Sequence, residues 1–104
     1  MNKEEIIEAL RECFLQQRRQ LYGAVFRRKL AAVSCHSPDW YHDRLEEIEA
    51  VTGIVEGCLL SGDLGRAARY IAAMHIMLDR LREKTDRECK ALLQKHGVYY
   101  DAFG

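Results

Sequence analysis

Hydrophobic residues recur at helical spacing in the stretch from Gly62 to Gly97. Six of them, three or four positions apart, share one side of an α-helix: Leu64, Ala67, Ile71, Met74, Leu78 and Leu81. Between residues 67 and 78 only Arg69 and His75 can carry charge. Ala72, Ala73 and Ile76 fall outside the main stripe, so this helix is expected to have neighbours on more than one side.

A first helix is expected from about Lys3 to about Val33. Asn2 is a suitable N-cap, and two acidic residues follow in the first turn. Five consecutive polar residues, 16–20, interrupt the apolar pattern and form a polar waist. One continuous helix is the preferred interpretation, and a kink near Tyr22-Gly23 is the alternative, because glycine costs about 1 kcal/mol in a helix interior.

A second helix is expected from Pro38 to about Leu60, after a loop at residues 34–37. Ser37 can cap it, and proline suits the first helical position. The short turn Ser61-Gly62-Asp63 then makes the second and third helices an antiparallel hairpin. The predicted fold is therefore all-α, with three long helices in which the first packs on the hairpin. Residues 1–97 would form a single bundle domain, and 98–104 a short aromatic tail.

Composition narrows the functional classes. The 104 residues are 48% hydrophobic and 31% charged, typical of one folded domain. Sixteen basic and sixteen acidic residues cancel, so the whole molecule has no net attraction for nucleic acid or anionic membrane. No apolar run approaches the roughly 20 residues of a membrane span, and the acidic N-terminus does not resemble a signal peptide. The expected location is cytoplasmic, with the four cysteines as free thiols and no membrane contact.

Histidine and cysteine residues offer two weak chemical signals. Cys35, His36 and His42 have the side chains of a zinc site, but the close ligand pairs and the fourth ligand of such sites are missing. No serine, cysteine or acid at helical spacing is expected to pair with His75 for acid–base chemistry. We therefore predict no catalytic residue, metal or cofactor, and a protein that is not an enzyme.

Basic residues concentrate in the first helix, at Arg18, Arg19, Arg27, Arg28 and Lys29. Aligned cations can bind phosphates, so a regulator that associates with nucleic acid is the alternative function. A basic helix face more often meets acids of a neighbouring helix, and the outer face of the second helix supplies them.

Unused apolar surface favours protein association. A three-helix arrangement gives each long helix two neighbours, so the middle of the third helix is expected to keep one side uncovered, which a homodimer would cover. The residues predicted for protein interfaces are Ile71, Met74, Met77 and Leu78, with Tyr99, Tyr100 and Phe103 of the tail as a second contact. The predicted function is a small regulatory adaptor, chaperone-like or inhibitor protein that binds a protein partner by helix-in-groove contacts.

Overall fold

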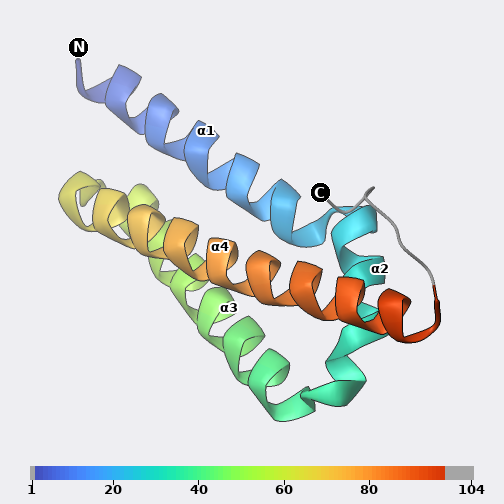
Figure 1. Ribbon diagram of the computed structural model, residues 1–104. Helices are drawn as coiled ribbons and strands as arrows, with labels where there is room; N and C mark the ends of the chain where they lie inside the picture. The colour runs from blue at the N-terminus through green and yellow to red at the C-terminus, as the bar shows by residue number, and fades with distance from the viewer. Residues whose placement is uncertain (1, 98–104) are drawn as a thin grey trace.

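Four α-helices and one short 3₁₀ turn make up the computed structural model, which describes residues 2–97 (Figure 1). The helices are α1 (Lys3–Tyr22), α2 (Ala24–Val33), α3 (Pro38–Ser61) and α4 (Leu64–Lys95), and the turn η1 (Ser34–His36) precedes α3. No strand occurs in this part of the chain, so the all-α class is confirmed. The predicted tail, with Tyr99, Tyr100 and Phe103, lies outside the described residues.

The prediction of three long helices is wrong at Gly23, where the expected first helix divides into α1 and α2. Gly23 has φ −61° and ψ 137°, an extended conformation that ends one helix and begins the next. The chain then changes direction, and α2 crosses the far end of α4 (Figure 1). The structure thus has the alternative considered above, a break at Tyr22-Gly23, because Leu30 and Val33 reach the core only when the chain turns.

Local capping signals explain the other helix ends. The Asn2 side chain accepts a hydrogen bond from the Glu5 amide (2.9 Å), and Asp63 accepts one from the Arg66 amide (3.3 Å). Gly62 ends α3 in the left-handed conformation, φ 77°, which glycine adopts without steric cost. Ser37 occupies the N-cap of α3 as predicted, although its side chain makes no capping hydrogen bond.

The core consists of two apolar clusters along the antiparallel α3–α4 hairpin. Near the hairpin turn, Phe14 of α1 packs with Val55, Ile71 and Met74. The larger cluster at the other end draws on all four helices and contains Leu21, Leu30, Val33, Tyr41, Ile48, Leu78, Leu81 and Cys89. The first cluster is therefore completed by α1, and the second by the end of α1 together with α2.

Candidate functional site: the outer face of the hairpin

Three of the four α4 residues predicted for an interface lie inside the chain's own core. Ile71 is 7% exposed, Met74 0% and Leu78 2%, because they contact α1 and α3. Met77 is half-buried at the edge of the larger cluster. The first three side chains are thus not on the surface, and the apolar surface of α4 consists of other residues.

Apolar side chains remain uncovered on the side of the hairpin that faces away from α1 and α2. Ile54 of α3 is 38% exposed and Ile76 of α4 is 52% exposed. The half-buried and exposed apolar residues on this side are called the outer face, and Ile76 lies at its edge. They are Val51, Ile54, Tyr70, Ala73, Ile76 and Met77. Only Met77 was among the residues predicted for an interface.

Contacts made by α1 and α2 show which side of the hairpin they cover. Arg82 of α4 donates a hydrogen bond to Gln20 (3.3 Å), and at 100° per residue Met77 lies about 140° around α4 from Arg82. Glu56 of α3 pairs with Arg18 of α1 (3.4 Å), and Ile54 lies about 160° around α3 from Glu56. Lys29 of α2 pairs with Asp86, which lies about 180° around α4 from Met77. The outer face is therefore turned away from both N-terminal helices.

Aromatic and charged groups border the outer face near the start of α3. The ammonium group of Lys84 lies 4.8 Å from the centre of the Trp40 ring and 2.8 Å from a carboxylate oxygen of Glu88. The other Glu88 oxygen accepts the hydroxyl hydrogen bond of buried Tyr41 (2.9 Å). Burial raises the pKa of Tyr41, and the hydrogen bond to Glu88 raises it further, so this phenol stays protonated. Burial alone would raise the pKa of Glu88, but the hydrogen bonds from Lys84 and Tyr41 lower it overall.

Sequence reasoning missed this network because its two α3 residues lie more than 40 positions from its two α4 residues. By spacing, Trp40 and Tyr41 belong to the apolar stripe of α3. Lys84 and Glu88 belong to a highly charged stretch of α4, which is typical of a solvent-exposed segment. The exposure of Ile54 could have been predicted from the sequence, since Ile54 falls outside the apolar stripe of α3.

The predicted basic patch is divided between several structural contacts. Arg18 pairs with Glu56, and Arg27 donates to the Leu21 carbonyl (2.8 Å) near the end of α1. Lys29 pairs with Asp86 of α4 (3.0 Å). Among residues 2–97, Arg19 and Arg28 are exposed without a hydrogen bond or ion pair. The five cations therefore do not form one phosphate-binding surface, because three of them are used in packing.

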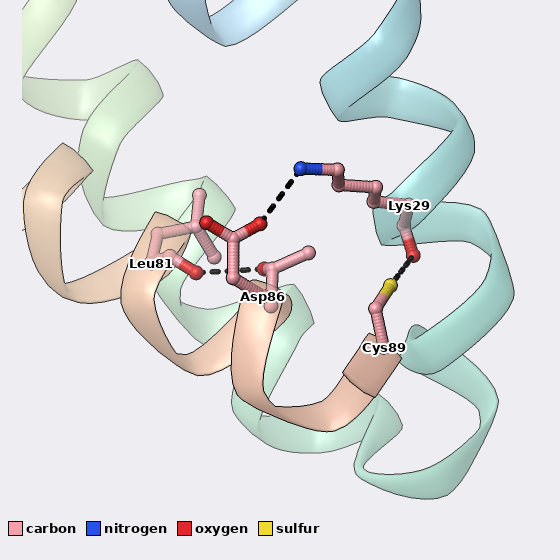
Figure 2. Close-up of polar contacts among 5 residues, drawn as sticks. Lys29, Leu81, Asp86 and Cys89 are labelled. Atoms are coloured by element: carbon pink, nitrogen blue, oxygen red, sulfur yellow. Dashed lines mark hydrogen bonds and ion pairs between the residues drawn. The ribbon is translucent and has the colours of Figure 1, made fainter. Parts of the chain in front are cut away.

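The junction of α2 and α4 holds a pocket of about 350 Å³. Figure 2 shows two polar contacts across this junction, the Lys29–Asp86 ion pair and the hydrogen bond that the Cys89 thiol donates to the Lys29 carbonyl (3.5 Å). The pocket is lined by Val25, Arg28, Lys29, Ala32, Cys89, Leu92 and Leu93. Burial raises the pKa of the Cys89 thiol, which makes it a poor nucleophile. These walls contain no carboxylate, hydroxyl or imidazole to act with the thiol.

The residues considered for metal or acid–base chemistry lie apart. The Cys35 thiol is exposed and contacts the Ala32 carbonyl (3.7 Å), whereas His42 pairs with Glu46 on its own helix (3.1 Å). The expectation that no acid at helical spacing pairs with His75 was wrong, because Asp79 lies four residues further along α4 and contacts it (3.4 Å). Both side chains are more than half exposed. Within residues 2–97 no group of three or more His, Cys, Asp or Glu side chains is placed to hold a metal ion.

Comparison with known protein families, with curated proteins and with solved structures gave no match for this chain. Along the described residues, no helix has both the length and the apolar character needed to cross a membrane.

Proposed function

We propose that this protein is a small, non-enzymatic protein-interaction module that works as a homodimer, with the outer face of the α3–α4 hairpin as its dimer interface. One observation carries the proposal: α1 and α2 pack on the same side of the hairpin, so apolar residues of α3 and α4 are uncovered on the other. An isolated exposed isoleucine needs no explanation, but a row shared by two adjacent helices is typical of an association surface.

A second copy is the simplest cover for such a face. Two-fold dimers are the commonest assemblies of identical chains, and they use the same patch on both copies. Two hairpins packed face to face would form a four-helix bundle at the interface, with an apolar centre between the two pairs of helices.

The adaptor, chaperone-like or inhibitor role is the wider part of this proposal. The pocket between α2 and α4 supports it, since apolar walls beside the exposed guanidinium of Arg28 suit an apolar anchor residue next to an acid on a partner helix. The pocket lies on the side of α4 that meets α2, so a partner there and a second copy on the outer face would occupy different surfaces.

Replacing both exposed isoleucines by glutamine tests the dimer interface. We expect the wild-type chain to sediment as a dimer at high micromolar concentration, and Ile54→Gln/Ile76→Gln to raise the dimer dissociation constant by at least about tenfold, because each copy loses apolar contact area. Sedimentation equilibrium measures the constant, and far-UV circular dichroism checks that the helices are retained.

Leu60→Gln is the matched control. Leu60 is 88% exposed on α3, but it lies about 120° around the helix from Ile54. Its substitution should leave the dissociation constant unchanged. A wild-type chain that stays monomeric, or a double variant that dimerises as tightly as wild type, would contradict the proposal.

A further inference from the structure

Charge is divided unequally between the two helices of the hairpin. Six acidic residues and a single Lys or Arg, Arg44, lie in α3, whereas α4 contains eight Lys or Arg residues and four acidic ones. The hairpin therefore places an acidic helix beside a basic one.

The charges that share the outer face keep this division. At 100° per residue, Asp43 and Glu47 lie within about 20° of Ile54 around α3. On α4, Arg66, Arg80 and Lys84 lie within about 60° of Met77, and Arg87 lies within about 20° of Arg80. Three of the four acids of α4, Asp79, Glu83 and Asp86, lie about 120–180° from Met77, and the fourth, Glu88, is bound by Tyr41 and Lys84.

Contacts between the helices show which residues lie at the same level along the hairpin. Lys84 contacts Trp40, and Tyr41 bonds to Glu88. Since the helices are antiparallel, Glu47 is level with about Arg80, and Ile54 with the segment from Tyr70 to Ala73. One half of the outer face thus carries acids on α3 and bases on α4, and the half nearer the turn is mainly apolar.

Two different two-fold arrangements would bring two such faces together. In the first, the two-fold axis is perpendicular to the helices and parallel to the faces, and α3 would lie on the α3 of the second copy. The charged half of each face would then lie on the apolar half of the other. With the axis parallel to the helices, α4 would lie on the α3 of the second copy at the same level. The second arrangement opposes bases to acids and apolar residues to apolar residues.

We infer that two copies of this chain associate with their two-fold axis parallel to the hairpin, so that α4 of each copy packs against α3 of the other. This inference rests on the proposed function, because it specifies the geometry of the same interface. Arg80 of one copy then lies near Asp43 and Glu47 of the second copy, and each contact occurs twice.

Charge reversal on one helix at a time tests this geometry. The α3 variant is Asp43→Lys/Glu47→Lys, and the α4 variant is Arg80→Glu/Arg87→Glu. All four side chains are exposed, so the fold should tolerate both variants. Each variant alone should dimerise about tenfold more weakly than wild type, because opposite charges become like charges. An equimolar mixture of the two variants should form a heterodimer of about wild-type affinity, and a chain with all four changes should regain the homodimer.

Controls and salt complete the experiment. Glu49→Lys lies on the same helix but about 140° from Ile54, so it should not alter the dissociation constant. The differences between variants should shrink in 1 M salt, where the Debye length falls to about 3 Å.

Two outcomes would overturn the inference while leaving the homodimer in place. One is a dissociation constant that is equal for wild type and both variants. The other is a chain with all four changes that dimerises as weakly as either variant, since its reversed acids and bases would then not face each other across the interface. A monomeric wild-type chain would instead remove the proposed homodimer itself, and the inference with it.

Discussion

Gln17 shows how a single polar residue in the waist of α1 is accommodated in the core. Its amide nitrogen donates a hydrogen bond to the Ile71 carbonyl (3.0 Å), and its side-chain oxygen is buried without a hydrogen-bond partner in the described structure. Gln17 is 8% exposed and lies between Phe14 and Leu21 on the face that meets α4. The polar waist therefore does not separate two apolar patches of α1. The side chain of Gln17 lies inside the core and bonds to the backbone of α4.

Replacing Gln17 with methionine should leave the protein as stable as wild type or more stable by about 1 kcal/mol. The nearly isosteric methionine removes an unsatisfied buried oxygen, and the Ile71 carbonyl belongs to the interior of a helix. Urea denaturation measures the free energy of unfolding, and Gln16→Met, at an exposed position of the same helix, is the control. A loss of more than 1 kcal/mol on Gln17→Met alone would show that the hydrogen bond outweighs the orphaned oxygen.

Helix boundaries followed from the sequence wherever a side chain or a glycine supplies a local signal. Asn2, Asp63 and Gly62 act in the structure as their types predict. The break at Gly23 could not be predicted in the same way, because the sequence alone does not show whether a glycine is helical or extended. The choice is made by packing, since Leu30 and Val33 join the core only after the turn.

Alanine at the two glycines should separate these cases. Gly62→Ala should destabilise the protein by about 1 kcal/mol, because φ 77° is costly for any residue with a Cβ atom. Gly23→Ala should change stability by less than about 0.5 kcal/mol, since φ −61° suits alanine and its Cβ would come no closer than 3.4 Å to the Arg19 carbonyl oxygen. Thermal unfolding of both variants provides the comparison. Equal effects at the two positions would contradict this conformational explanation.

For the molecule as a whole, the sequence predicted uncovered apolar surface on α4 but assigned most of it to residues that the structure buries, Ile71, Met74 and Leu78. The stripe Ile71, Met74 and Leu78 is the most regular, so it is the part that the chain's own helices bury first. The exposed residues of the outer face lie off the stripe, Ile76 of α4 and Ile54 of α3. Regular periodicity thus identifies the core, and the proposed association surface includes apolar residues that break it.

In the molecule as a whole, α2 covers one end of the core, and few polar contacts join it to α4. Lys29, whose side chain is 13% exposed, reaches Asp86, and the Cys89 thiol bonds to the Lys29 carbonyl (Figure 2). Cys13 and Cys35 are exposed, whereas Cys58 and Cys89 are buried. Of the two buried thiols, only Cys89 lies against α2, so the accessibility of Cys58 and that of Cys89 depend on different parts of the fold.

Thiol labelling should therefore detect movement of α2. With an alkylating reagent in excess, Cys13 and Cys35 should react quickly, and Cys58 and Cys89 only when the protein opens. Asp86→Asn removes the charge that holds Lys29, and it should speed labelling of Cys89 several-fold without changing that of Cys58. Mass spectrometry of the labelled peptides reads each cysteine separately. Equal acceleration at both buried cysteines would mean that α2 leaves α4 only when the whole bundle unfolds.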